Sequence, residues 1–80
     1  MEVISVMLPD SLKRFRQKFQ LTQKNVANAL GVRESSYQRY EHGKVVPSVN
    51  VMIKLSNIYN VSVDYLVGLS DVPTIQRYST

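Results

Sequence analysis

The chain has 80 residues, ten Lys and Arg against six Asp and Glu, one histidine and no cysteine, which gives a net charge of +4. Eighty residues fill one small domain and leave little room for a deep substrate cavity. The lack of cysteine excludes disulfides, iron–sulfur clusters and thiolate zinc sites, and a single histidine argues against a metal site or a catalytic relay.

Residues 1–9 are expected to form an N-terminal arm, which either pairs with another segment or frays. Its β-branched residues favour a short strand, namely Val3, Ile4 and Val6. The first helix is expected to begin at Asp10, which can accept a hydrogen bond as its N-cap. An inward-facing stripe with helical spacing follows, formed by Leu12, Phe15, Arg16 and Phe19.

Four more helices are predicted from their first and last residues. Thr22 and Gly31 bracket the second helix, Glu34 to His42 forms the third, Pro47-Ser48 and Asn60 bracket the fourth, and Ser62 and Gly68 bracket the fifth. Short connections between short helices predict a compact all-α domain of five helices over residues 10–68. Residues 69–80 form a tail that is a disordered end, a short helix or part of a subunit contact.

The second and third helices, at about residues 22–42, form a helix-turn-helix. Ala27 is small enough for the two helices to cross closely, and Gly31 accommodates the positive φ of the turn. Eight basic and two acidic residues lie between Lys13 and Lys44, a local charge of +6, whereas the rest of the chain carries −2. Such a basic half is typical of a surface that binds a polyanion, although a merely solvated face explains the charge equally well.

The chain resembles the Cro/Xre-type helix-turn-helix family of phage-repressor-like regulators. The resemblance runs from Leu12 to Leu66 and rests on LTQKNVANALGV, YQRYEHGKVVPS and LSNIYNVSVDYLVG at the family's spacing. It implies a five-helix, lambda-repressor-like fold and binding to double-stranded operator DNA as a homodimer. A dimeric repressor whose third helix enters the major groove is therefore the expected function.

The resemblance also implies site residues. The expected base contacts come from Arg33, Glu34, Ser35, Gln38 and Arg39. The expected contacts to the DNA backbone come from Thr22, Gln23, Lys24, His42 and Lys44. Arg16 and Glu41 match a structural ion pair between the first helix and the end of the third. The apolar residues of the fifth helix and its end either complete the core or form the dimer interface, namely Val63, Leu66, Val67 and Leu69.

Three residues depart from the family pattern. Gln20 stands where a glycine commonly ends the first helix, which predicts strain or an altered turn. Arg33 replaces the usual Ser or Thr cap of the third helix, and a cation there opposes the helix dipole. Glu34 places an anion opposite a polyanion, which a cytosine amino group or Arg39 would have to satisfy.

Other classes of function receive less support from the sequence. A protein-interaction or antitoxin-like role on the same fold is the alternative, because the apolar fifth helix and the tail could serve a protein partner. No nucleophile–base pair, phosphate loop or metal cluster supports an enzyme or a cofactor, and 80 residues hold no separate small-molecule domain. No secretory signal or membrane span is expected, so the predicted location is the cytoplasm, at the nucleoid, for a protein encoded by a bacterium or a phage.

Overall fold

The computed structural model describes the backbone of residues 2–68 and the side chains of residues 7–68. The helices are α1 (Glu2–Lys18), α2 (Gln23–Leu30), α3 (Glu34–Glu41), α4 (Val49–Tyr59) and α5 (Val63–Leu66). The expected all-α fold is confirmed, and no strand occurs within residues 2–68. The described part of the chain has no helix that is both long and apolar enough to cross a membrane.

Three of the helices begin at residues whose side chains cap them. Thr22, Ser48 and Ser62 each accept a hydrogen bond from the backbone N–H three residues later, at 3.0, 3.2 and 3.0 Å. The Thr22 N–H in turn donates to the side-chain oxygen of Asn25, Oδ1, at 3.0 Å, which completes a capping box. These bonds satisfy donors that the helix itself leaves unpaired, and they fix where α2, α4 and α5 start.

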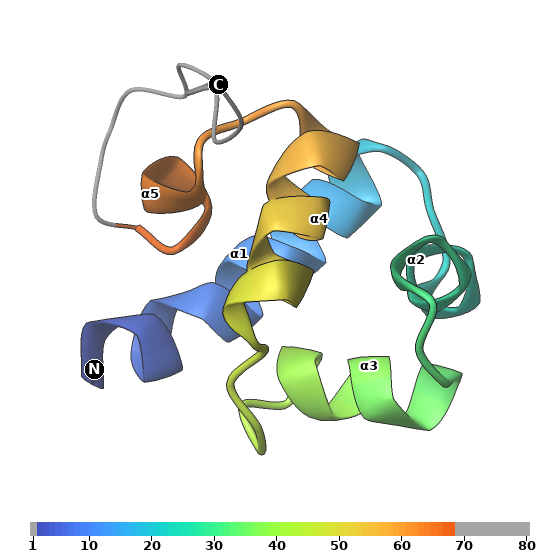
Figure 1. The fold of residues 1–80 in the computed structure, drawn as a ribbon, viewed down its shortest axis with the longest axis horizontal. Coiled ribbons are helices and arrows are strands. Elements are labelled where there is room, and N and C mark those ends of the chain that lie inside the picture. Colours follow the sequence, from blue (N-terminus) through green and yellow to red (C-terminus); the bar gives the residue numbers. More distant parts are fainter. Residues whose placement is uncertain (1, 69–80) are drawn as a thin grey trace.

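The core lies where α4 crosses α1, with α5 on one side, α2 on the other and α3 at the end of the molecule (Figure 1). The Phe15 ring stacks on Tyr59 at a centroid distance of 5.2 Å and meets the edge of Tyr65 at 5.9 Å, which joins α1 to α4 and α5. The other apolar residues that are almost fully buried are Leu8, Leu12, Val26, Ala27, Leu30, Tyr37, Met52, Leu55, Val61, Leu66 and Val67.

The prediction of a strand or arm over residues 1–9 is wrong, because α1 already begins at Glu2 and Asp10 lies inside it rather than at its N-cap. Leu8 is buried in register with Leu12 and Phe15, at the i, i+4 and i+7 positions of one helix face. Pro9 has no N–H and removes one hydrogen bond of this helix. Burial of Leu8 offsets that local loss, so tertiary packing extends the helix through the proline.

The turn after α1 confirms the strain expected at Gln20. Its φ is 58°, a left-handed conformation that glycine adopts freely and that costs a residue with a Cβ about 1–2 kcal/mol. The turn is held by two backbone bonds, from the Gln20 N–H to the Gln17 carbonyl and from the Leu21 N–H to the Arg16 carbonyl, both at 3.0 Å. The geometry is thus fixed, and the side chain at residue 20 is the strained element.

Replacing Gln20 with glycine is expected to raise the free energy of unfolding by about 1 kcal/mol. In a domain of this size the melting temperature should rise by about 4–8 °C. Asn60 has the same φ of 58°, but asparagine tolerates this conformation, so Asn60→Gly is the matched control and should change stability little. Thermal unfolding followed by circular dichroism measures both. Equal effects at the two positions would contradict the assignment of strain to Gln20.

Candidate nucleic-acid interface

The left-handed backbone of Gly31 forms the turn between α2 and α3. Its φ is 75°, and its N–H donates to the Asn28 carbonyl at 3.1 Å while the next N–H, of Val32, donates to Ala27 at 3.0 Å. These bonds satisfy the last carbonyls of α2 and reverse the chain sharply. Ala27 is 1% exposed at this crossing, which fits the expected need for a small residue there.

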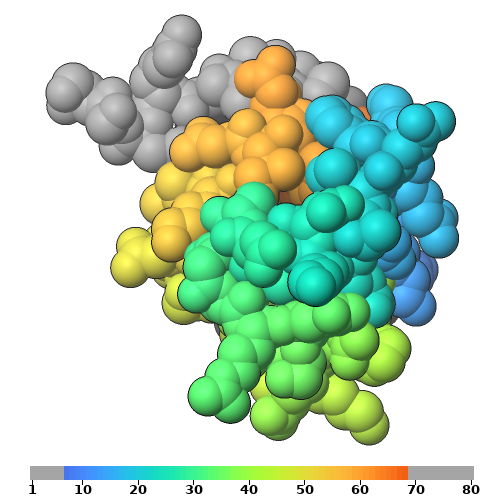
Figure 2. Space-filling model, turned by 90° about the vertical axis from the view of Figure 1, so that its right-hand side faces the viewer, coloured from blue at the N-terminus to red at the C-terminus, as the bar shows by residue number. Residues whose placement is uncertain are grey.

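Helix α3 has one face in the core and one in solvent. Tyr37 and Glu41 point inward and are 0% and 1% exposed, whereas Glu34, Ser35 and Arg39 are exposed. Figure 2 shows α2 in teal above α3 in green, with side chains of α3 and the following segment projecting at the lower edge of the molecule. The residues predicted to contact bases therefore share an outward face, except Gln38, which is half-buried.

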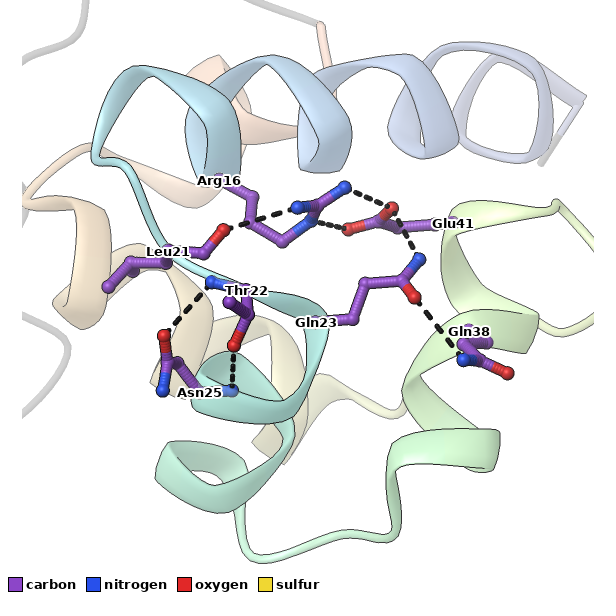
Figure 3. A network of polar contacts seen from close by, with 7 residues as sticks. All are labelled: Arg16, Leu21, Thr22, Gln23, Asn25, Gln38 and Glu41. Atoms are coloured by element: carbon purple, nitrogen blue, oxygen red, sulfur yellow. Dashed lines mark hydrogen bonds and ion pairs between the residues drawn. The ribbon is translucent and has the colours of Figure 1, made fainter.

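The buried carboxylate of Glu41 is paired with Arg16 of α1, as the sequence predicts. Arg16 Nε donates to Glu41 Oε2 at 2.6 Å and a second guanidinium nitrogen, Nη2, donates to Oε1 at 3.1 Å, which is a two-point contact (Figure 3). The remaining nitrogen, Nη1, donates to the Leu21 carbonyl at 3.1 Å. Arg16 thus ties α1 both to α3 and to the segment that leads into α2.

Two glutamines extend this ion pair into a network. Gln23 Nε2, at the start of α2, donates to Glu41 Oε1 at 3.1 Å, and Gln23 Oε1 accepts from Gln38 Nε2 of α3 at 3.2 Å. Figure 3 shows the Gln23 amide between the two α3 side chains. The orientation of α3 relative to α2 is therefore fixed by side-chain bonds as well as by apolar packing.

The network also determines the charge state of Glu41. Burial by itself would raise the pKa of this carboxyl, but the polar contacts with Arg16, Tyr37 and Gln23 outweigh it and hold the pKa below its ordinary value of 4.5. The same pair raises the pKa of the Arg16 guanidinium. Burial raises the pKa of Tyr59 to about 12 and that of Tyr37 further, so both tyrosines are neutral.

We expect the ion pair to dominate the acid sensitivity of the fold. Because the folded-state pKa of Glu41 is depressed, its contribution is present above the ordinary pKa of 4.5 and is lost as the pH falls below it. Arg16→Met and Glu41→Met should each destabilise the domain by about 3 kcal/mol at pH 7, because each leaves a charge without its partner. The double variant should lose less than the sum of the two, by about 1–3 kcal/mol.

Urea unfolding of the four proteins at pH 7 and at pH 3 measures this coupling. The coupling should shrink at pH 3, which lies below the ordinary pKa of 4.5, because Glu41 is then protonated in the unfolded chain and the pairing no longer adds its full stability. Asp10→Asn, which removes an exposed carboxylate of α1, is the control and should change stability by less than about 0.5 kcal/mol. Coupling that is independent of pH would show that packing, not charge, joins the two side chains.

The residues expected to bind the DNA backbone lie at the start of α2 and just after the end of α3. Thr22 and Lys24 are exposed at the start of α2, and His42 and Lys44 are exposed just after α3. Gly43, with φ of 72°, turns the chain there, and the Lys44 N–H closes the turn on the Arg39 carbonyl at 2.9 Å. The arrangement is a polar helix face flanked by cations, and the residues that the structure describes contain no cluster of acidic, histidine or cysteine side chains that could hold a metal ion.

The sequence pattern of the helix-turn-helix family matches residues 12–66, which is the segment that contains this arrangement. The chain belongs to the helix-turn-helix family. It is 43% identical over 61 residues to the HTH-type transcriptional regulator ImmR of Bacillus subtilis, covering 76% of this chain and 48% of that protein. It is 41% identical over 61 residues to the HTH-type transcriptional regulator YqaE of the same organism, covering 76% and 53%.

More distant similarities agree with the helix-turn-helix assignment. The cryptic phage CTXphi transcriptional repressor RstR of Vibrio cholerae is 28% identical over 61 residues, covering 76% of this chain and 54% of that protein. The crystal structure of a transcriptional regulator from Listeria innocua superposes with a TM-score of 0.72 over 90% of this chain and 63% of that one, at 22% identity, which shows a shared fold. This chain spans about half the length of the curated relatives named here.

Two of the four residues predicted for the dimer interface are instead buried in the core of the chain. Leu66 is 0% exposed and Val67 is 2% exposed, so both side chains are core residues of one chain and cannot contact a second one. The short α5 must bury its apolar side because the α1–α4 pair alone does not enclose the core. Val63 is half-buried, and Leu69 and the tail lie outside the described residues.

Sequence reasoning missed two features of this helix-turn-helix. Lys54 Nζ of α4 donates to the Leu30 carbonyl at 3.3 Å, so a cation stabilises the C-terminal end of α2. Val45 and Val46, after the third helix, are 39% and 46% exposed, and Val45 lines a small hollow together with residues of α3. In the sequence the two residues form an apolar pair between Lys44 and Pro47, and this pair belongs to none of the predicted helix faces.

Proposed function

We propose that the chain is a sequence-specific, double-stranded-DNA-binding transcription regulator that represses as a homodimer in the bacterial cytoplasm. The observation that carries the proposal is the exposed polar face of α3, with Glu34, Ser35 and Arg39, held outward by the buried Arg16–Glu41 pair. Family membership and the names of ImmR and RstR support it. A homodimer is included because one small domain offers few contacts, and two related half-sites multiply the affinity.

In this proposal α3 enters the major groove and its exposed face meets the base edges. Arg39 binds guanine through O6 and N7, and Glu34 accepts from a cytosine amino group. Ser35 lies between them, and Arg33 and Gln38 lie at the margin of the groove. Gln38 is already bonded to Gln23, so we assign it a smaller share of base recognition than Arg39.

The proposed contacts to the phosphates come from the residues that flank α3. Gln23 and Thr22 lie at the N-terminal end of α2, where unpaired backbone N–H groups favour anions. Lys24 is exposed beside them, and His42 and Lys44 are exposed just after the end of α3. Arg16 is paired with Glu41 and is left out of the count of cations that face phosphate.

A gel shift with DNA from upstream of the chain's own gene, repeated at two salt concentrations, tests the function. Retention of one sequence over random DNA at both salt concentrations is the expected result. If the affinity for the specific and for the random DNA falls equally as the salt concentration rises, the alternative of a protein-interaction module is favoured.

Two substitutions separate base recognition from phosphate binding. Arg39→Ala should cost about 1–3 kcal/mol and relax the preference at one base position, because a base contact carries sequence information. Lys44→Ala should weaken all sequences alike and reduce the slope of log K against log salt by about one, because it removes one phosphate contact. Titrations of a duplex set varied one base pair at a time measure both. Uniform weakening by Arg39→Ala would make Arg39 a phosphate contact instead.

Arg33 provides an independent test. It stands at the N-cap of α3 without a side-chain cap bond, whereas Thr22, Ser48 and Ser62 cap α2, α4 and α5 with one. Arg33→Thr should stabilise the free protein by about 1 kcal/mol by supplying a cap and removing a cation from the positive helix end. The same change should weaken DNA binding. Lys13→Gln removes an equal charge from an exposed position of α1 and is the control. Stabilisation without loss of affinity would remove Arg33 from the interface.

A further inference from the structure

The N-terminal turns of α1 lie outside the segment that the helix-turn-helix pattern matches, which begins at residue 12. In Figure 1 they extend past the crossing with α4, on the side of α5. Pro9 stands inside this helix, where proline is less favourable than alanine because it lacks an N–H and its ring crowds the preceding turn. Burial of Leu8 explains why the helix continues through residue 9, but it does not explain why that residue is a proline.

Pro9 covers the glycine that turns the chain after α3. Gly43 has a left-handed φ of 72°, and a Cβ at this residue would lie 3.4 Å from Pro9 Cγ, which is van der Waals contact. Pro9 is half-buried and Gly43 is exposed, so the contact lies at the surface of the domain. The proline ring of α1 therefore rests against the backbone of the turn.

The turn at Gly43 sets the position of Lys44. The Gly43 N–H donates to the Tyr40 carbonyl at 3.2 Å, and the Lys44 N–H donates to the Arg39 carbonyl at 2.9 Å. The residues on either side of the glycine, His42 and Lys44, are exposed and are two of the proposed phosphate contacts. A change in this turn would therefore move these two residues and leave the outer face of α3 in place.

The segment of α1 that carries Pro9 is itself held from two sides. Leu8 is 2% exposed in the core. Met7 packs against the end of α5, where a Cβ at Gly68 would lie only 2.8 Å from Met7 Cε. Because both neighbours are anchored and the pyrrolidine ring has little freedom to rotate, Pro9 is a rigid stop for the turn at Gly43.

We propose that Pro9 is a positioning residue that braces the turn after α3, so that His42 and Lys44 meet the DNA phosphates. The inference rests on the proposed function, because it takes these two residues as phosphate contacts. A turn that is in place before DNA arrives does not have to be ordered on binding, which favours affinity. Since phosphate contacts carry no direct sequence information, the brace changes affinity and not base preference.

Hydrogen exchange of the free protein tests the brace without DNA. In Pro9→Ala the Lys44 amide should exchange about fourfold faster, the effect of losing a contact the size of one CH₂ group. The Val61 amide, which closes the turn after α4 on the Ser56 carbonyl at 3.0 Å, should not exchange faster. The melting temperature should rise, because alanine restores a helix N–H and favours the helix.

Gln17→Ala is the matched control for the change in helix propensity. Gln17 is an exposed, uncharged residue of the same helix, on the C-terminal side of the crossing with α4. Alanine favours the helix there as well. The exchange rate of the Lys44 amide should nevertheless stay as it is in the unchanged chain, because the contact between Pro9 and Gly43 is kept.

A double-mutant cycle connects the brace to DNA. The probe is the duplex that the full chain enriches from a randomised library. Pro9→Ala should weaken its binding about fourfold, and this effect should fall below about twofold in the Lys44→Ala background, where a contact that the brace positions is missing. In the Arg39→Ala background the full effect should persist. Pro9→Ala by itself should leave the preference at every base position unchanged.

Stability and affinity are expected to change in opposite directions, which a merely structural proline would not cause. A lower melting temperature together with weaker binding overturns the inference. Specific binding with unchanged Lys44 exchange in Pro9→Ala, or with additive effects of Pro9→Ala and Lys44→Ala, also overturns it and leaves the proposed function intact. A library that yields no enriched duplex overturns the proposed function, and with it the role assigned to Pro9.

Discussion

The rest of the interface depends on the ion pair between Arg16 and Glu41. A carboxylate that is 1% exposed must be paired and hydrogen-bonded, and only one orientation of α3 allows both contacts with Arg16 and the third with Gln23. Because the inner face of α3 is fixed in this way, its outer face is fixed as well. A charge pair buried inside the domain therefore decides which side chains the domain presents to a ligand.

The pair also changes the electrostatics of the surface. Arg16 is one of the eight basic residues between Lys13 and Lys44, but its charge is neutralised by Glu41. The exposed cations near α3 include Arg33 before the helix, Arg39 on its outer face and Lys44 after it. In the proposed complex they would position DNA without holding it tightly, so base contacts and a second subunit would supply the rest of the affinity.

Two residues depart from the local preferences of turns and helix caps. Gln20 adopts a conformation suited to glycine, and Arg33 stands at a helix start without capping it. Each departure costs about 1 kcal/mol, a notable share of the stability of a small domain. Arg33 stands beside the exposed face of α3, where the proposed contact with DNA would offset that cost. Nothing in the structure explains the glutamine at residue 20.

The bounds of α2 to α5 and the helix-turn-helix follow from signals that can be read in the amino-acid sequence, whereas the start of α1 does not. Caps at Thr22, Ser48 and Ser62 and the left-handed residues Gly31 and Asn60 act locally, so they can be read without knowing the neighbours. Only the tertiary structure decided features that depend on distant contacts. Burial of Leu8 extends α1 through Pro9, and enclosure of the core takes Leu66 away from any dimer contact. Val45 faces α3 only because a turn brings it there. Local signals fix where helices begin and end, whereas packing decides which surface remains free to bind.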